Sequence, residues 1–339
     1  MAKRIKSFIV PIFIPNMGCP HKCVFCNQKN ITGQVNFDIE NIDNIINNAL
    51  KSKRFRKTNG IEVAFYGGTF TNLSISYITK LLSTINKYYD KGIVKSIRIS
   101  TRPDTINDSI LTILKKYNVQ TVELGAQSLD NRVLKLSSRG HTAQHIINAF
   151  FLLKEKNFKV GIQLMPGLPG DNRDIFINTV YKVIELKPDM VRLYPTLVIK
   201  GTTLEVLYKH GKYIPLYIEQ AVDICANALI LFEKRGIPVI RIGLMNSESL
   251  LESIVAGPWH PSFGFLVRSM AFIKSCVMPL LKNKSNKEVK VLVNPNQIPL
   301  IKGYKNIGIK MIEKETGVKI KKIIPKKDMY IHNIKVEEI

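Results

Sequence analysis

The sequence has few cysteines, few acidic residues and no long apolar run, and each scarcity excludes a class of protein. Only 5 of its 339 residues are cysteine, a small and odd number for a disulfide-rich secreted fold. No apolar run approaches the roughly 20 residues that span a bilayer, so the sequence predicts no contact with a membrane. Internal repeats and low-complexity segments are also missing, which excludes a solenoid.

Acidic residues are also few. The chain has 26 Asp and Glu but 50 Lys and Arg, which gives a formal net charge of +24 at pH 7. This imbalance favours acidic partners, above all nucleic acid. A chain rich in Lys, Ile and Asn throughout, as biased codon usage would produce, is the alternative explanation. The hydrophobic share of 45% and the charged share of 22% are those of a globular protein that buries a core.

The N-terminus faintly resembles a signal peptide, because a basic start precedes a short apolar stretch between Met1 and Pro15. Two prolines interrupt that stretch, no small-residue cleavage site follows it, and clustered cysteines come next. We therefore predict that this segment is the first strand of a cytoplasmic protein.

Short β-branched runs alternate with stretches of helical period along the first two thirds of the chain. The predicted strands are Ser7–Ile14, Ile61–Tyr66, Ser96–Ser100, Thr121–Leu124, Val160–Leu164 and Met190–Tyr194. The predicted helices are Asp38–Lys51, Ser74–Tyr89, Asn107–Tyr117, Ala143–Lys156 and Arg173–Leu186. Strands separated by helices imply right-handed βαβ units and a parallel sheet, here an α/β fold with a partial (β/α)6-type barrel. In such barrels the active site is built from the loops that follow the strands.

The last third of the chain has a different pattern and a stronger charge. Between Lys282 and Lys327 there are 13 lysines against 3 glutamates. The pattern first predicts a helix at Tyr217–Lys234, a short strand at Pro238–Ile242 and a helix that ends near Leu281. It then predicts a strand at Val289–Val293, a helix at Ile298–Glu315 and a strand at Val318–Ile324. We expect three parts, namely a barrel core at 1–245, a helical linker that closes the barrel at 246–281, and a small basic α/β appendage at 282–339.

Three cysteines, Cys19, Cys23 and Cys26, follow the first predicted strand with the spacing C-x3-C-x2-C. Three thiolates on one loop can bind three irons of a cubane cluster and leave the fourth iron open for a reaction. The alternative is a structural zinc ion with His21 as the fourth ligand, although zinc sites usually combine ligand pairs from two segments and no second pair exists. Cys225 and Cys276 lie in apolar helical stretches and are predicted to be buried small hydrophobes.

The cysteine spacing resembles the signature of radical S-adenosylmethionine (SAM) enzymes. Phe65-Tyr-Gly-Gly-Thr69, one βα unit later, resembles the glycine motif of that superfamily. The resemblance implies a [4Fe-4S] cluster held by Cys19, Cys23 and Cys26, with SAM bound to the open iron. It further implies cleavage of SAM to a 5′-deoxyadenosyl radical that abstracts hydrogen, a chemistry that belongs to the cofactor. Gly67, Gly68 and Thr69 would receive the amino group of SAM, and Phe25 would stack on adenine or else cover the core.

Further stretches resemble the radical-SAM domain of Elongator subunit 3 and, more loosely, oxygen-independent coproporphyrinogen oxidase. They are Ser100–Asp104, Glu123–Ser128, Ser138–Thr142, Gln163–Asp171 and Arg192–Gly201. The resemblance covers roughly residues 5–260 and implies SAM contacts by Gln127, Arg139 and Gln163, with Arg139 as a bidentate clamp on the carboxylate. Ser100 stands where that group commonly has a glutamate that contacts SAM, and it completes the set of implied SAM contacts. Nothing in the sequence resembles the acetyltransferase domain of Elongator subunit 3, so acetyl transfer is not expected.

Several other residues admit a functional and a structural interpretation. His141 and His145 are spaced for a metal pair, but without a third ligand we predict capping and surface roles. Lys200 follows the sixth strand and either faces a substrate or is solvated. The basic stretch Lys51–Lys57 is predicted to be a solvated loop at the bottom of the barrel. Ile301–Ile307 distantly resembles the KH turn that clamps a nucleic-acid backbone, with its second glycine missing.

The prediction is a cytoplasmic radical-SAM enzyme with RNA, in particular tRNA, as its substrate. The resemblance also implies an electron donor such as flavodoxin or ferredoxin. One alternative is a radical-SAM enzyme that acts on a small metabolite or tetrapyrrole. The other is a non-catalytic RNA-binding protein with a structural metal site. No catalytic residue is assigned from the sequence.

Overall fold

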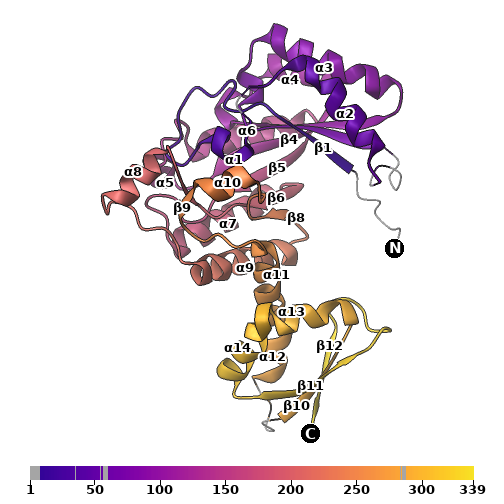
Figure 1. Ribbon diagram of the computed structural model, residues 1–339, viewed down its shortest axis with the longest axis vertical. Helices are drawn as coiled ribbons and strands as arrows, with labels where there is room; N and C mark the ends of the chain where they lie inside the picture. Colours follow the sequence, from indigo (N-terminus) through magenta and orange to yellow (C-terminus); the bar gives the residue numbers. More distant parts are fainter. Residues whose placement is uncertain (1–7, 35, 54, 56–59, 283, 285–287) are drawn as a thin grey trace.

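The structure is a computed structural model that describes residues 8–34, 36–53, 55, 60–282, 284 and 288–339. It has a large part built around one parallel sheet and a small part that ends at the C-terminus, and helix α11 (Phe263–Phe272) lies between them (Figure 1). The first residue of the predicted strand at Ser7 and three of the seven residues of the predicted loop Lys51–Lys57 lie outside the described residues.

The large part is a curled half-barrel of seven parallel strands, whose spatial order follows the chain. The strands are β1 (Phe8–Phe13), β2 (Ile61–Tyr66), β3 (Val94–Thr101), β4 (Val119–Gln127), β5 (Lys159–Leu164), β6 (Met190–Leu193) and β8 (Val239–Ile242). All six strands predicted for the barrel are present. The strand predicted at Pro238–Ile242 pairs with β6 and becomes the seventh member of the same sheet.

The helices between these strands pack on the outer side of the sheet and bury the apolar stripe that predicted them. They are α2 (Ile42–Lys51), α3 (Ile75–Asp90), α4 (Asp108–Lys116), α6 (Ala143–Glu155), α7 (Arg173–Leu186) and α9 (Ile218–Lys234). The starts of α3, α4 and α7 are fixed by side-chain caps, since Ser74, Asn107 and Asn172 each accept a hydrogen bond from the first turn. The predicted helix Asp38–Lys51 starts later, because Asp38 caps a 3₁₀ turn that precedes α2.

Six short elements were not predicted, because none is long enough to show a hydrophobic period. They are α1 (Gln28–Thr32), α5 (Asn131–Leu136), α8 (Thr203–Lys209), α10 (Glu248–Ser253) and the antiparallel pair β7 (Val198–Ile199) and β9 (Ile254–Ala256). All lie beside the strand ends where a barrel places its active site.

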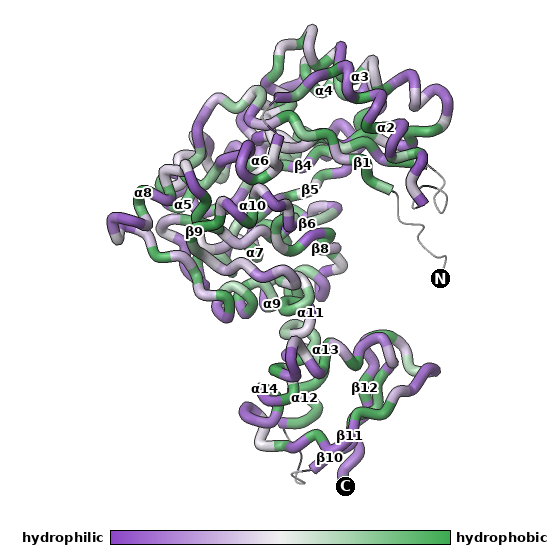
Figure 2. Tube along the Cα trace, in the orientation of Figure 1, coloured by the Kyte–Doolittle hydropathy of each residue, from purple (hydrophilic) through white to green (hydrophobic). Residues whose placement is uncertain are grey.

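Helix α11 continues through a π-helical turn, Ile273–Val277, into α12 (Met278–Leu281). Contrary to the sequence prediction, this 19-residue helix is long and apolar enough to cross a membrane by length and composition. Figure 2 shows much of it on the hydrophobic side of the scale. Val267 and Phe272 are buried, the former in the barrel core and the latter in the core of the small part. Part of its apolar surface therefore packs within the protein, and 44% of the segment is buried.

The small part is a three-stranded sheet covered by two helices. Its elements are β10 (Glu288–Val293), α13 (Ile298–Lys302), α14 (Ile307–Thr316), β11 (Lys319–Pro325) and β12 (Ile334–Glu338), and β10 is the central strand. The single helix predicted at Ile298–Glu315 is wrong, because the backbone turns left-handed at Gly303, Lys305 and Asn306 and divides it. The final strand β12 was missed, since its five residues include only two apolar ones, Ile334 and Val336, and give a weak apolar signal.

Candidate functional site

A cavity of about 300 Å³ opens at the carboxyl ends of the barrel strands. All eleven residues predicted to bind the cluster or SAM line it, although they come from six separate stretches of the chain. They are Cys19, Cys23, Phe25, Cys26, Gly67, Gly68, Thr69, Ser100, Gln127, Arg139 and Gln163. Parallel strands bring these stretches together, because every β-to-α loop leaves the sheet at the same edge.

The cysteine loop is fastened to the barrel at several points. Val24 lies at its centre, where its N–H donates to Ser137 O (3.3 Å) and its carbonyl accepts from Leu204 N–H (2.8 Å). Each thiol has a polar neighbour: Cys19 Sγ lies 3.3 Å from Thr69 Oγ1, Cys23 Sγ accepts from Arg139 (2.9 Å), and Cys26 Sγ accepts from Gln28 (3.7 Å). Donors directed at sulfur are suited to thiolates that bind iron.

The pKa of the Cys26 thiol is raised to about 12, mainly by burial and then by the nearby Cys23 and Cys19, whereas Gln28 and Arg139 oppose this rise. A buried thiol of this kind stays protonated unless a metal stabilises the thiolate. Among the described residues, no three His, Cys, Asp or Glu side chains gather around one point as a single zinc ion requires. The His21 ring instead packs against Gly140, where an added Cβ would lie 2.3 Å from it. A cubane fits these residues better, because each thiolate then binds its own iron.

The two glycines after β2 have different structural roles. Gly67 has φ of 95°, a conformation that strongly favours glycine. At Gly68 an added Cβ would lie 2.4 Å from Met17 O and 2.7 Å from Ile14 O. The sequence explanation for this glycine was a close approach of SAM, and the structure adds that the cysteine loop itself requires the missing side chain.

The Gly68→Ala variant should therefore disturb the cysteine loop before it affects any ligand. We expect reconstituted protein to hold less than half of the parent's iron and to lose about 1–3 kcal/mol of unfolding free energy, as overpacking costs elsewhere. Gly211→Ala is the control, because an added Cβ meets nothing within 4 Å there. The φ of 67° at Gly211 adds a backbone strain that Gly68 does not have, so a loss of iron in Gly68→Ala alone reports the steric clash. Parent-like iron in Gly68→Ala would contradict this account.

Gln127 ends β4 with φ of 71°, a left-handed conformation that is rare for a residue other than glycine. The β4–β5 register shifts at the same place. As a result the Gln127 side chain lies in the cavity, where its Oε1 accepts a hydrogen bond from Gln163 Nε2 at 3.1 Å. Strain of this kind is concentrated at functional sites.

Arg139 is buried behind the cysteine loop and extends into the cavity. Besides Cys23, its guanidinium contacts Gly125 O, and its own carbonyl accepts from Arg102. The Nε atom has no hydrogen-bond partner within the described structure. An unpaired donor on a buried cation is suited to a carboxylate. Phe25 lines the cavity and also packs in an apolar cluster with Val24, a position compatible with either interpretation of this ring.

A buried network of charges lies beneath these residues, and sequence reasoning missed it. Glu123 contacts both Arg98 and Arg192, with Glu123 Oε2 at 2.7 Å from Arg192 Nε, and Glu62 Oε2 lies 3.0 Å from Arg98. Arg192 also donates to Tyr66 Oη (2.7 Å). Burial followed by the Glu123 charge raises the pKa of Tyr66, so it remains a neutral phenol. The sequence pattern that could have indicated this network is a polar residue at alternate positions of strands that are otherwise apolar.

Other predicted roles are partly corrected. His145 caps α6 as predicted, but His141 is buried, and burial followed by Arg139 lowers its pKa to about 3. It is therefore neutral at pH 7 and does not lie on the surface. Lys200 donates to Glu252 O (2.8 Å). Cys225 is fully buried as predicted, whereas Cys276 is only partly buried beside the core of the small part.

Comparisons with known proteins agree with this geometry. The radical SAM superfamily model matches residues 13–181, and the radical SAM C-terminal domain model matches residues 188–271. Together the two models cover more than half of the chain.

The chain is also similar to individual proteins, in sequence and in structure. The chain is 29% identical over 265 residues to a tRNA uridine(34) acetyltransferase of Methanocaldococcus jannaschii, covering 67% of this chain and 49% of the relative. It is 28% identical over 264 residues to Elongator complex protein 3 of Dictyostelium discoideum, covering 71% and 46%. Archaeal Elp3 of Methanocaldococcus infernus superimposes with a TM-score of 0.61 and 25% identity over 77% of this chain and 61% of that one. The chain thus spans about half the length of the curated relatives it matches.

Proposed function

Because the chain belongs to the radical SAM superfamily and is an enzyme of the Elp3 type, related to tRNA modification, we propose that it binds a [4Fe-4S] cluster through Cys19, Cys23 and Cys26. SAM would bind in the cavity beside them. The observation that carries this proposal is the convergence of all eleven predicted contacts on one cavity. When bound, the cluster and SAM would supply a 5′-deoxyadenosyl radical for hydrogen abstraction.

The role of this chain's residues would be to bind the cluster and SAM and to orient them for the reaction. The three thiolates would hold the iron. The Arg139 guanidinium donates to Gly125 O, and the Arg139 carbonyl accepts from Arg102, so both the side chain and the backbone of the residue that would clamp the SAM carboxylate are fixed. The main chain at Gly67–Thr69 receives the amino group, while Ser100, Gln127 and Gln163 contact the polar remainder of SAM. Phe25 closes the adenine side of the cavity.

Removing the Arg139 side chain tests this placement. We expect Arg139→Ala to weaken SAM binding about 10- to 150-fold in iron-replete protein, the equivalent of a charge-assisted bond of about 1.5–3 kcal/mol. Arg132→Ala is the matched control, because Arg132 lies exposed on α5, seven positions earlier in the chain. Equilibrium dialysis with labelled SAM measures both. Equal affinities in the parent and in Arg139→Ala would show that the clamp is placed wrongly.

We further propose that the substrate is RNA, in particular tRNA, and that the enzyme works in the cytoplasm with a donor such as flavodoxin or ferredoxin. Support for RNA comes from the net charge of +24 and from the similarity to a tRNA uridine(34) acetyltransferase. We also propose 1–245, 246–281 and 282–339 as the functional divisions of the chain.

One experiment tests the proposed function. After anaerobic reconstitution with iron and sulfide, the protein is incubated with SAM and dithionite, with and without tRNA, and 5′-deoxyadenosine is quantified. We expect the nucleoside to form in both reactions, and faster with tRNA. If 5′-deoxyadenosine forms in neither reaction, the radical-SAM activity is rejected. If it forms at the same rate with and without tRNA, the result favours a small metabolite as the substrate.

A further inference from the structure

The appendage contains two helices joined by a very tight turn. Strand β10 is followed by α13, the turn Gly303–Asn306, α14 and then β11, which pairs parallel to β10. An added Cβ at Gly303 would lie 2.7 Å from Gly308 N, and one at Gly308 would lie 2.4 Å from Ile301 O. Both glycines are therefore required for the two helices to meet this closely.

The backbone of this turn explains why the second glycine of a Gly-x-x-Gly loop can be missing. Gly303 begins the turn with φ of 68°, and Asn306 ends it with φ of 60° and ψ of 17°. Asparagine is among the few residues other than glycine that adopt the left-handed conformation readily. Asn306 stands where the KH pattern has its second glycine, and its backbone has the left-handed conformation that asparagine can adopt in place of glycine.

The surface around the turn carries positive charge, one aromatic ring and one aliphatic side chain, without opposing carboxylates. Lys302, Lys305 and Lys310 are exposed, and none pairs with an acidic residue in the described part of the chain. Tyr304 is 39% exposed and Ile307 58% exposed. No Asp or Glu occurs between residues 302 and 312. Lysines beside apolar and aromatic side chains form the usual surface for single-stranded nucleic acid.

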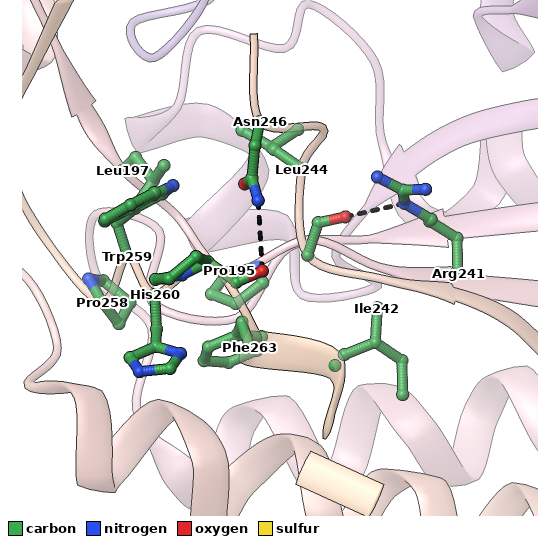
Figure 3. A pocket seen from close by; sticks show the side chains of 13 residues that line it. Pro195, Leu197, Arg241, Ile242, Leu244, Asn246, Pro258, Trp259, His260 and Phe263 are labelled. Carbon is green, nitrogen blue, oxygen red and sulfur yellow. Dashed lines mark hydrogen bonds between the residues drawn. The ribbon is translucent and has the colours of Figure 1, made fainter. Parts of the chain in front are cut away.

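The turn also lies next to the barrel. Tyr304 packs edge-on against His260, with ring centroids 4.9 Å apart and planes at 80°. His260, Trp259 and Phe263 line a pocket of about 130 Å³ (Figure 3). Pro195, Leu197, Arg241 and Leu244 line both this pocket and the large cavity. These four residues thus form a wall shared by the pocket beside the turn and the cavity proposed for SAM.

We propose that the turn Gly303–Asn306 clamps the sugar–phosphate backbone of a single-stranded RNA segment and places one of its bases in the pocket beside His260. KH domains use such a turn to hold about four nucleotides of backbone. The pocket is small and has the flat rings of Trp259, His260 and Phe263 in its lining, which suits a base, and Arg241 belongs to the wall that it shares with the large cavity. The Arg241 side chain donates to Gly243 O (3.1 Å) and has no carboxylate partner among the described residues. This inference rests on the proposed function, because it specifies where and in which form the RNA binds.

The test uses the full-length protein and a labelled single-stranded RNA of about ten nucleotides, within the usual site size of such surfaces. We expect Lys305→Asp to weaken binding at least tenfold by fluorescence anisotropy and to lower the salt slope by about 0.7 for each phosphate that the protein no longer neutralises. Lys327→Asp is the matched control, since it makes the same charge change in the turn after β11, and it should bind within twofold of the parent. Asn306→Gly should retain parental affinity, because it restores the Gly-x-x-Gly pattern. Thermal unfolding confirms that each variant is folded.

Three results would overturn the clamp: equal weakening by Lys305→Asp and Lys327→Asp, loss of binding in Asn306→Gly, or equal competition by a duplex of the same length. If the parent binds RNA but Lys305→Asp binds it equally well, only this inference fails. If the parent binds no RNA, the RNA substrate fails as well, while formation of 5′-deoxyadenosine without RNA still tests the cofactor half of the proposed function.

Discussion

Cys19→Ala, Cys23→Ala and Cys26→Ala should each retain little of the four irons that a cubane contains. With one thiolate gone, an iron corner is left to solvent and the cluster disassembles. The loop itself should stay in place, because the backbone of Val24 is fixed to Ser137 and Leu204 independently of any metal. The loss therefore reports a missing ligand and not an unfolded loop.

Iron and sulfide per chain, with the visible absorption band, measure this effect after anaerobic reconstitution. Cys225→Ala and Cys276→Ala are the matched controls and should keep the parental iron content. Cys225 lies in the barrel core and Cys276 beside the core of the small part, both remote in the fold from the cysteine loop. Zinc in place of iron in carefully anaerobic preparations would contradict the cluster.

The large elements of this fold were predictable because each is long enough to show its period. The alternation of strands and helices indicated a parallel barrel, and the common exit of its loops indicated a single site. Cys19–Cys26 and Phe65–Thr69 are local motifs, so they could be read without the structure. The divided helix at Gly303–Asn306 could not, because its apolar period runs on across a turn that only backbone angles reveal.

The polar interior of the barrel was the main feature that sequence reasoning missed. Parallel strands buried on both faces are expected to be apolar throughout. Here Glu62, Arg98, Glu123 and Arg192 occupy inward positions of β2, β3, β4 and β6. Gly161 makes room for one of them, since an added Cβ there would lie 3.0 Å from Glu123 Cγ. Which charge meets which depends on strand register, and the spacing of motifs along the chain does not contain that information.

Glu123→Gln should be the most destabilising single change at the site, because the Glu123 carboxylate contacts two buried arginines. The side chains of Arg98 and Arg192 are only 8% and 14% exposed, and that of Glu123 only 4%. Glutamine keeps the shape but removes the charge, which leaves one buried cation uncompensated. Breaking a buried pair in this way costs about 3–5 kcal/mol, a large share of the roughly 5–15 kcal/mol that stabilises a typical protein.

Urea unfolding of the parent and the variant, followed by circular dichroism, measures the change. The matched control is Asp43→Asn, since Asp43 contacts Lys87 at 2.6 Å but both side chains are more than 40% exposed. A solvated pair of this kind contributes at most about 1 kcal/mol, because water screens it. The difference between the two variants isolates burial as the cause, since both remove one negative charge from an ion pair. If Glu123→Gln costs no more than Asp43→Asn, the arginines obtain their compensation elsewhere, and the network does not stabilise the barrel beneath the cavity.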